Sequence, residues 1–393
     1  MSWKKKYERN WGRLGMKYKT YTMEDALEAI IDYRGKTPKK SEKGIPTLSA
    51  KSVKNNHIDY DSCYYISSDE YKRFMVRGLP QIGDVLLTTE APLGMVAQLD
   101  RHDVGIAQRL LTLRGKQGIL DNEYLLYYLQ SPIGQALLRA RETGTTVTGI
   151  KQSEFRKIQI DIPDIENQRK IGGILRGLDD KIAVNNSINK NLEQQMLAIF
   201  DNAKRTSSWN NHKLGDVLTF FDNLRKPLSS IQRGKMAHIY PYYGATSIVD
   251  YVEDFLFDGT YILISEDGAN VIDIFGHPLT QYTYGKFWIN NHAHIVKGIN
   301  NYSDALIYAM LGTLNMQSIV TGAAQPKINQ ANLRNFEAAL PECEEAQALS
   351  DVLNPMFQQI IYHDQENEKL SALRDILLPQ LMFGKLDVSD III

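Results

Sequence analysis

The chain has 393 residues, of which 43% are hydrophobic and 23% charged, which is enough for two or more domains with separate cores. It contains no run of eighteen apolar residues, and no apolar segment follows the basic start, so the sequence predicts neither a membrane span nor a secretory signal. Its two cysteines, Cys63 and Cys343, indicate a reducing cytoplasm rather than a disulfide scaffold.

The formal net charge is −1, but charge is unevenly distributed along the chain. Residues 1–40 contain eleven basic and five acidic side chains, whereas residues 342–393 contain three basic and ten acidic ones. The near-zero total therefore does not exclude nucleic acid as a partner. A basic segment can face phosphates while acidic helices face proteins.

In chain order, Met23–Asp32 has helical spacing and leads into a basic loop, Arg34–Lys40. Strand-like runs separated by glycine and proline follow at Ile45–Ala50, Asp84–Thr89, Gly94–Leu99 and Ile106–Leu113. Two helices at Tyr124–Gln130 and Pro132–Arg141, a strand at Ile158–Ile162 and a long helix after Pro163 complete the first half. This order predicts a mixed α+β domain with a trailing helix.

The chain then repeats itself. Thr143–Pro163 aligns without a gap with Thr321–Pro341, 178 positions later. The second half keeps the same order, with expected counterparts at Leu214–Phe221 (opening helix), Arg225–Pro227 (basic loop), Tyr261–Glu266 (opposite Val85–Glu90), Tyr302–Leu314 (helix) and Gly322–Gln330 (loop opposite Gly144–Gln152). Two copies of this length predict a duplicated domain plus helix rather than a solenoid.

Both long helices carry apolar residues in alternating steps of four and three, the seam of a coiled coil. The apolar seam positions are Ile171, Leu175, Leu178, Ile182 and Leu192 in the first helix and Leu349, Leu353, Met356, Ile360 and Leu370 in the second. Polar residues that fix the register interrupt both seams, at Asn185 and Asn189 and at His363 and Asn367. Two ordinary amphipathic core helices remain the alternative. Pro355 is awkward for either interpretation because a mid-helix proline kinks or breaks a helix.

Several of these segments together resemble a known family, the specificity subunit of type I restriction-modification systems. They are the run IDIPDIENQRKIGGILRGLDDKI with its echo at Leu340–Ile361, the ending Leu370–Leu381, and the strand-turn TTEAPLGMVA. The resemblance implies an α+β fold in which two pseudo-symmetric target recognition domains are separated by a long antiparallel two-helix coiled coil. The expected parts are a basic N-terminal extension (1–18), the first domain (19–163), helix 1 (164–206), the second domain (207–341), helix 2 (342–383) and a tail (384–393).

The resemblance also implies partners and chemistry. The chain would read a bipartite, asymmetric target in double-stranded DNA, and would assemble with two methyltransferase subunits and with restriction subunits. It would carry no catalytic site and no cofactor itself. S-adenosylmethionine, Mg²⁺ and ATP, and the DNA adenine methyltransferase and endonuclease activities, would belong to those partner subunits in the cytoplasm.

Candidate DNA contacts follow from loop chemistry. Basic loop side chains suit phosphates, namely Arg34, Lys36, Lys39, Lys40, Arg225 and Lys226. Polar side chains near predicted strand ends suit base edges or the groove, namely Ser49, Lys51, Thr89, Glu90 and Gln108 in the first domain and Tyr243, Thr246, Glu266, Asp267, Asn291 and His292 in the second. Each of them could equally be a solvated loop residue. The Gly144–Gln152 and Gly322–Gln330 loops could also serve as joints between domain and helix.

Three fragments invite catalytic interpretations. Asp164 with Asp179–Lys181 has the loose spacing of a nuclease metal motif, but a helix would place the aspartates more than about 20 Å apart. Asn354–Phe357 resembles a methyltransferase signature but lies on a predicted helix without a glycine-rich cofactor loop. His292 and His294 lack a third metal ligand nearby in the sequence. We therefore expect no metal site and no catalytic site.

Two further hypotheses differ in class from a DNA-reading subunit. A structural protein could use the duplicated coiled coil to assemble other subunits without reading DNA. A stand-alone methyltransferase would have to bind its cofactor by itself, and the sequence offers no site for it. Mutation of the basic loops would separate the DNA-reading subunit from the scaffold. Loss of DNA binding with intact assembly would rule out the scaffold.

Overall fold

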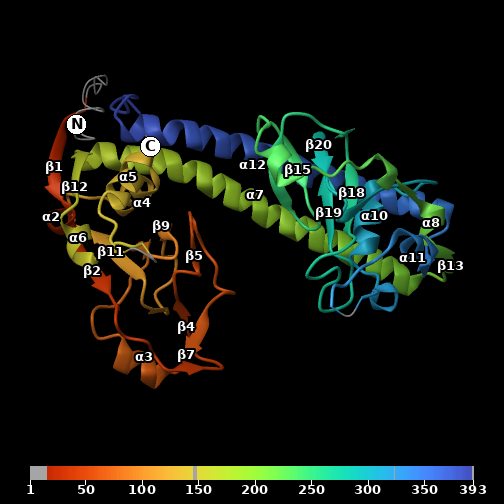
Figure 1. The fold of residues 1–393 in the computed structure, drawn as a ribbon, viewed down its shortest axis with the longest axis horizontal. Coiled ribbons are helices and arrows are strands. Elements are labelled where there is room, and N and C mark those ends of the chain that lie inside the picture. Colours follow the sequence, from red (N-terminus) through yellow and green to blue (C-terminus); the bar gives the residue numbers. More distant parts are fainter. Residues whose placement is uncertain (1–15, 145–147, 323, 392–393) are drawn as a thin grey trace. The chain divides into compact units, whose positions relative to one another are not determined.

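The computed structural model describes residues 16–144, 148–322 and 324–391. Most of the predicted basic extension (1–18) and parts of the two repeated loops lie outside these residues. The chain divides into two compact units, Met1–Ala183 with Asn367–Ile393, and Val184–Glu366. Each unit contains one α+β domain and one stretch of each long helix (Figure 1).

The first domain is built on a four-stranded sheet in the order β2-β11-β8-β9 and a second sheet in the order β10-β4-β7-β3. The strands are β1 (Tyr18–Thr22), β2 (Leu27–Asp32), β3 (Lys40–Ser41), β4 (Ile45–Leu48), β5 (Val53–Lys54), β6 (His57–Ile58), β7 (Tyr64–Ile66), β8 (Val85–Thr89), β9 (Leu93–Gln98), β10 (Gly105–Ile106), β11 (Leu110–Gly115) and β12 (Gln159–Pro163). The helices are α2 (Met23–Ala26), α3 (Ser68–Phe74), α4 (Asn122–Gln130), α5 (Pro132–Arg139) and α6 (Gln152–Arg156). The β1–β12 and β5–β6 pairs are separate.

The second domain repeats the strand order of the main sheet, as β14-β21-β18-β19, and has a separate β13–β22 pair, while its second sheet has the order β16-β15-β20-β17. Its strands are β13 (Asn210–Lys213), β14 (Leu218–Phe220), β15 (Tyr240–Tyr243), β16 (Ile248–Val252), β17 (Phe257–Asp258), β18 (Tyr261–Ser265), β19 (Thr280–Thr283), β20 (Lys286–Ile289), β21 (Ala293–Gly298) and β22 (Glu337–Leu340). Its helices are α8 (Leu214–Val217), η1 (Asp222–Leu224), α9 (Ser230–Arg233), α10 (Asp304–Leu311), η2 (Gln317–Ile319) and α11 (Gln330–Asn335). The predicted duplication and α+β class are confirmed.

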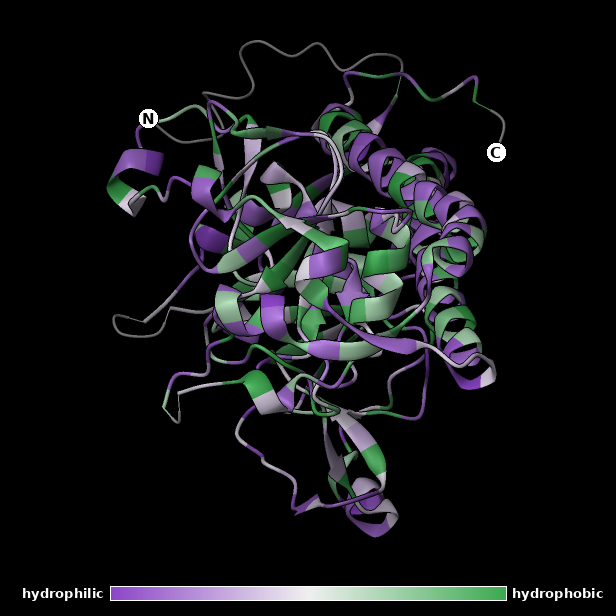
Figure 2. Cartoon of the chain, turned by 90° about the vertical axis from the view of Figure 1, so that its right-hand side faces the viewer, coloured by the Kyte–Doolittle hydropathy of each residue, from purple (hydrophilic) through white to green (hydrophobic). Residues whose placement is uncertain are grey.

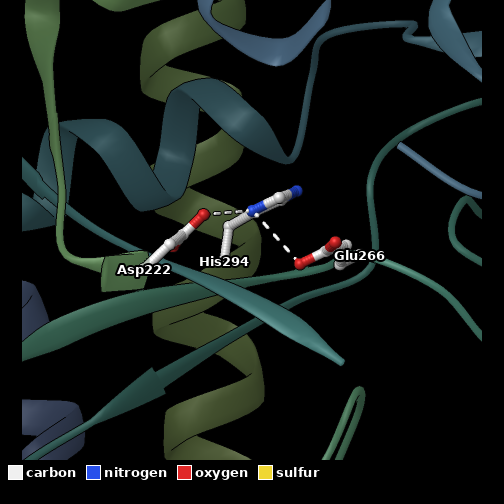
Figure 3. Close-up of side chains that lie close together, drawn as sticks. All are labelled: Asp222, Glu266 and His294. Atoms are coloured by element: carbon white, nitrogen blue, oxygen red, sulfur yellow. Dashed lines mark hydrogen bonds and ion pairs between the residues drawn. The ribbon is translucent and has the colours of Figure 1, made fainter. Parts of the chain in front are cut away.

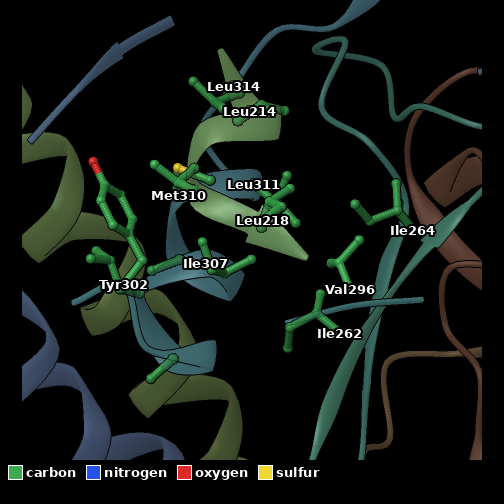
Figure 4. Packing of buried hydrophobic residues seen from close by; sticks show 14 of the residues in the cluster. Leu214, Leu218, Ile262, Ile264, Val296, Tyr302, Ile307, Met310, Leu311 and Leu314 are labelled. Atoms are coloured by element: carbon green, nitrogen blue, oxygen red, sulfur yellow. The ribbon is translucent and has the colours of Figure 1, made fainter. Parts of the chain in front are cut away.

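The second domain's core lies between its main sheet and α10. Ile262, Ile264 and Val296 project from the sheet toward apolar residues of the helical layer, including Ile307 and Leu311 (Figure 4). All five are fully buried. The first domain packs α4 on its sheet in the same way, with Leu125 and Tyr127 buried. Apolar residues of the strands thus meet short helices that are buried on most of their faces.

The two predicted opening helices are wrong beyond their first turn. The helix expected at Met23–Asp32 is one turn, α2, after which Leu27–Asp32 forms β2 against β11. Likewise, the helix expected at Leu214–Phe221 is α8 followed by β14. Consecutive β-branched residues at Ile30 and Ile31 suit a strand, and pairing with a distant strand outweighs the local helical spacing. The run Ile106–Leu113 is likewise interrupted, forming β10 and β11.

Backbone pairing also corrects the alignment of the repeat. The sequence aligns Glu90 with Glu266, but the structure aligns Glu90 with Asp267. Glu90 forms a bridge with Gly149, and Asp267 forms one with Lys327, 178 positions after Gly149. The counterpart of Glu266 is therefore Thr89, which changes how the two domains' candidate residues compare.

The long helices are α7 (Ile165–Thr206) and α12 (Cys343–Met382), and each unit contains an antiparallel stretch of the pair. Arg374 contacts Asp179 in the first unit, while Asn185 contacts Glu366 and Asn189 contacts Asp364 in the second. Purple hydrophilic and green hydrophobic residues alternate along both helices (Figure 2). α12 continues through Pro355.

The predicted seam residues are buried to different degrees. Ile171, Leu175, Leu353 and Ile360 are fully buried. The others are partly buried, namely Leu178, Ile182, Leu192, Leu349, Met356 and Leu370. Across the helix pair, Nδ1 of His363 lies 2.7 Å from Oδ1 of Asn189. Within the described residues, none of the helices is long and apolar enough to cross a membrane.

Candidate nucleic-acid interface

In the first domain, several chain segments meet where β8 ends. The amide of Thr89 donates to the carbonyl of Arg109 just before β11, at 3.0 Å. The amide of Ile150 donates to the carbonyl of Thr89 at 2.9 Å, which joins the repeated loop to the strand end. Asp32, at the end of β2, pairs with Leu111, so the basic loop after β2 leaves from the same place. We name this region, around Glu90 and Arg109, the first strand-end edge.

The second domain has the same backbone arrangement where β18 ends. The amide of Glu266 donates to the carbonyl of His292, and the amide of Ile328 donates to the carbonyl of Glu266, both at 2.9 Å. The segment after β14, residues 221–225, leaves beside this point, since the amide of Phe221 bonds Ile295. This region, around Asp267 and His292, is the second strand-end edge.

Asp222, Glu266 and His294 form a polar cluster beneath the second edge (Figure 3). Nδ1 of His294 lies 2.6 Å from Oδ2 of Asp222 and 3.6 Å from Oε2 of Glu266. Its Nε2 lies 2.8 Å from the carbonyl oxygen of Ile328. A carbonyl oxygen can only accept, so Nε2 of His294 donates to Ile328 and ties the repeated loop to the domain, while Nδ1 faces the two carboxylates.

Cations complete the cluster. Arg225 approaches Glu266 at 2.7 Å, and Nζ of Lys327 approaches the same carboxylate at 3.0 Å. Burial raises the pKa of the Asp222 carboxyl, but the hydrogen bond and charge of His294 outweigh it and leave the pKa below its ordinary value. Burial likewise raises the pKa of Glu266, and the bonds from Arg225 and Lys327 outweigh it.

Asp222, Glu266 and His294 are residue types that can bind a metal ion, with ligand atoms within 4.8 Å of one another. The arrangement nevertheless fits a metal poorly. Nε2 of His294 already donates to the carbonyl of Ile328, so only Nδ1 faces the space between the carboxylates. Arg225 and Lys327 already compensate the carboxylate of Glu266, and both positive groups would repel a divalent ion. The cluster therefore holds a loop in place.

Four of the six predicted phosphate-binding residues are exposed, namely Lys36, Lys39, Lys40 and Lys226. The two arginines are engaged inside their domains. Nη2 of Arg34 donates to the carbonyl of Ile150 at 2.8 Å, and the side chain of Arg225 is only 14% exposed. Ile150 and Ile328 are repeat counterparts, so Arg34 in the first domain and His294 in the second bind equivalent carbonyls of the repeated loop.

The predicted base-reading residues largely gather at the two edges. At the first edge lie Thr89, Glu90 and Gln108, with Ser49 beside them because β4 runs parallel to β10. At the second lie Glu266, Asp267, Asn291 and His292, with Tyr243 nearby through the bond from the amide of Asn290 to its carbonyl.

These residues differ in exposure. Those exposed are Lys51, Gln108, Thr246, Asn291 and His292. Thr89 and Tyr243 are buried, and the ring of Tyr243 packs on Phe287, so a contact with DNA would require either side chain to be uncovered. Their roles remain predictions.

Sequence reasoning missed Arg109, whose side chain is paired with Glu90 at 2.7 Å. The signal available was its position next to Gln108, directly before a strand. It also missed His294 as a loop anchor, because Asp222 and Ile328 are far from it in the sequence.

Comparison with known proteins identifies the family. A family model described as the type I restriction modification DNA specificity domain matches the chain twice, over residues 17–194 and 206–372. The chain belongs to this family. With two copies of the domain, it is a specificity subunit of a type I restriction-modification system.

Relatives of similar length support this assignment. The chain is 24% identical over 387 residues to the type I restriction enzyme MjaIX specificity subunit of Methanocaldococcus jannaschii, covering 88% of each. It is 23% identical over 362 residues to the EcoprrI specificity subunit of Escherichia coli, covering 84% of this chain and 86% of the relative. The crystal structure of an S subunit from M. genitalium has the same fold, with a TM-score of 0.55 at 17% identity over 95% of this chain and 98% of that one.

Proposed function

We propose that this specificity subunit reads a bipartite, asymmetric target in double-stranded DNA, with each domain reading one half at its strand-end edge. The observation that carries the proposal is that the two edges share one backbone framework but differ in side chains. Glu90, Arg109 and Gly149 occupy the positions that Asp267, His292 and Lys327 occupy in the second domain. Two domains with the same backbone framework but different side chains at its edge are suited to reading two unlike half-sites.

The same proposal extends to the assembly. Two methyltransferase subunits that methylate adenine, and restriction subunits that cleave, would perform the chemistry with S-adenosylmethionine, Mg²⁺ and ATP. The domain borders suggested by the sequence, 19–163 and 207–341 for the reading domains and 164–206 and 342–383 for the helices, belong to this proposal. Support comes from the two family matches and from the antiparallel helix contacts within each unit.

Methylome sequencing of a host with and without this chain tests the function. We expect a methylated motif of two short, unlike halves around a nonspecific spacer, present only when the chain is expressed. A methylated motif that persists unchanged without the chain, or the absence of any motif with it, would contradict the proposal.

A scaffold that assembles other subunits without reading DNA is the competing function, since the helix pair would serve it equally well. Replacing Lys36, Lys39, Lys40 and Lys226 by alanine separates the two functions. A DNA reader loses affinity while its assembly, measured by size-exclusion chromatography with the partner subunits, stays intact. Arg34 and Arg225 are kept, because their internal bonds would confound the result with misfolding.

A further inference from the structure

We propose that Arg109 and His292 are equivalent base-reading residues, one in each domain, each oriented by a carboxylate at the neighbouring strand end. Arg109 would read a guanine with its guanidinium fork, and His292 would make a single hydrogen bond to a base. This inference rests on the proposed function and names the side chains that would carry its specificity.

The equivalence of the two residues comes from backbone pairing. Leu110 pairs with Thr88 on β11 and β8, and Ala293 pairs with Ser265 on β21 and β18. Arg109 directly precedes Leu110, and its carbonyl accepts a hydrogen bond from the amide of Thr89. In the same way His292 precedes Ala293, and its carbonyl accepts from the amide of Glu266. Arg109 and His292 therefore occupy the same position in the two frames.

Each residue is also paired with the equivalent acid. Nε of Arg109 lies 2.7 Å from Oε1 of Glu90, and Nδ1 of His292 lies 2.6 Å from Oδ1 of Asp267. Glu90 and Asp267 correspond through their bridges to Gly149 and Lys327. Both domains thus have a basic side chain paired with an acid at the same position of the fold. The residues themselves differ, since the pair is Arg109 with Glu90 in the first domain and His292 with Asp267 in the second.

The pair leaves the recognition groups of Arg109 available. Its side chain is 51% exposed and that of Glu90 31%. The closest approach of Glu90 is to Nε of Arg109, and an arginine oriented from that side can turn its two terminal nitrogens toward O6 and N7 of guanine in the major groove. An arginine held in this way loses less conformational entropy on binding than a free one.

His292 has a smaller capacity to discriminate between bases. With Nδ1 bound to Asp267, only Nε2 remains, and the side chain is 48% exposed. One nitrogen makes one hydrogen bond, whereas the fork of Arg109 makes two. We therefore expect a stricter base preference at the first edge than at the second.

A purely structural ion pair explains Arg109 less well. An exposed ion pair contributes little to stability. Arg109 nevertheless adopts a left-handed backbone, with φ of +73°, which costs a side-chain-bearing residue energy. Gly149 lies so close that an added Cβ would come within 2.8 Å of Cβ of Glu90 and 2.6 Å of the carbonyl oxygen of Thr89. The surroundings thus fix the acid that orients Arg109.

The test uses the complete complex of this chain with its methyltransferase partners and the motif found by methylome sequencing. Each position of both half-sites is varied, and binding of wild type, Arg109→Lys, Arg109→Gln and His292→Gln is measured. We expect both Arg109 variants to lose about 5- to 150-fold in preference for a guanine at one position of one half-site, with the other half unchanged. His292→Gln should relax one position in the opposite half, by a smaller factor.

Lysine makes the test sharp, because it keeps the charge but lacks the fork. If Arg109→Lys binds like wild type while Arg109→Gln weakens binding to all sequences alike, Arg109 contacts a phosphate and the inference is wrong. Retention of the wild-type base preference by every variant overturns it too. Arg101→Lys is the matched control and should change nothing, since Arg101 is another ion-paired arginine, with its side chain 42% exposed, and lies before β10.

Glu90→Gln tests the positioning role separately. It should weaken the same guanine preference as Arg109→Gln and add little when combined with it, since both act through one contact. Independent, additive effects would overturn the coupling. Failure of the proposed function would look different, because the wild-type complex itself would then show no preferred motif.

Discussion

The carboxylate of Asp222 accepts three of the described hydrogen bonds within the second domain. Its donors are His294 at 2.6 Å, the amide of Ile295 at 2.9 Å and Gln330 at 2.7 Å. Each donor prefers the ionised carboxylate, so the native state holds this group charged more strongly than the unfolded chain does. Through the bond from Gln330, Asp222 binds the start of α11.

The lowered pKa of Asp222 predicts a pH dependence of stability. Its contribution is complete above the ordinary value of 3.8 and is lost as the pH falls through the lower native pKa. Asp222→Asn should therefore destabilise the protein near neutral pH, and its difference from wild type should shrink below about pH 4. Urea unfolding from pH 3 to 7 measures this. Asp258→Asn, the same charge change at an exposed position, is the control, and a difference independent of pH would contradict the prediction.

Asp179 on α7 plays a comparable part in the first unit. It accepts from Tyr127 at 2.6 Å, from Asn56 at 2.8 Å and from Arg374 of α12 at 2.7 Å. Asp179→Ala removes the acceptor of the buried Tyr127 hydroxyl and of the Asn56 amide and leaves Arg374 paired with Asp375 alone, so it should cost about 3 kcal/mol of unfolding free energy. The neighbouring Asp180 is exposed and pairs only with Arg176 in the structure's described contacts, so Asp180→Ala should cost under about 1 kcal/mol. Equal losses in denaturant unfolding would refute this assignment.

At the scale of elements, the sequence predicts what depends on local pattern. Apolar runs bounded by glycine and proline locate β8 and β9, and Asp121 caps α4 by accepting hydrogen bonds from the amides of Glu123 and Tyr124. The opening helices fail because β2 and β14 are specified by their partners β11 and β21, more than seventy residues away. Two helical turns of apolar spacing cannot reveal such a partner.

In the candidate interface, too, local sequence pattern predicts some features, whereas features that depend on distant contacts are missed. Polar loops at strand ends could be found from the sequence, and most predicted residues do lie at the two edges. Arg109 could not be singled out, because its left-handed backbone and its pairing with Glu90 depend on contacts between separate strands. The anchor of His294 likewise joins residues 72 positions apart.

Pro355 supplies a prediction about α12. The helix passes through this exposed position without interruption, although proline lacks an amide donor and crowds the preceding turn. Pro355→Ala should therefore raise the free energy of unfolding by about 2 kcal/mol. Thermal and urea unfolding would measure the change, with Gln358→Ala, another exposed position of α12, expected to stay within about 0.5 kcal/mol. A loss of stability would mean that the helix needs the shape of proline there.

For the whole molecule, the net charge of −1 conceals a local basic surface that DNA binding requires. Lys36 and Lys39 on the loop after β2, and Lys40 at the start of β3, are exposed, and the end of β2 pairs with Leu111 beside the first strand-end edge. Phosphate contacts from such a loop release counterions, whereas acidic segments elsewhere contribute nothing to that release.

Replacing Lys36, Lys39 and Lys40 by alanine should therefore reduce the salt dependence of DNA binding by the assembled complex. Each lost phosphate contact lowers the slope of log affinity against log salt by about 0.9, so the triple variant should lose up to about 3. The preferred motif should not change, because phosphate contacts position the protein without reading bases. Lys116→Ala, at the opposite end of β11 from Arg109, should leave the slope unaltered. An altered motif with an unchanged slope would mean that these lysines read bases.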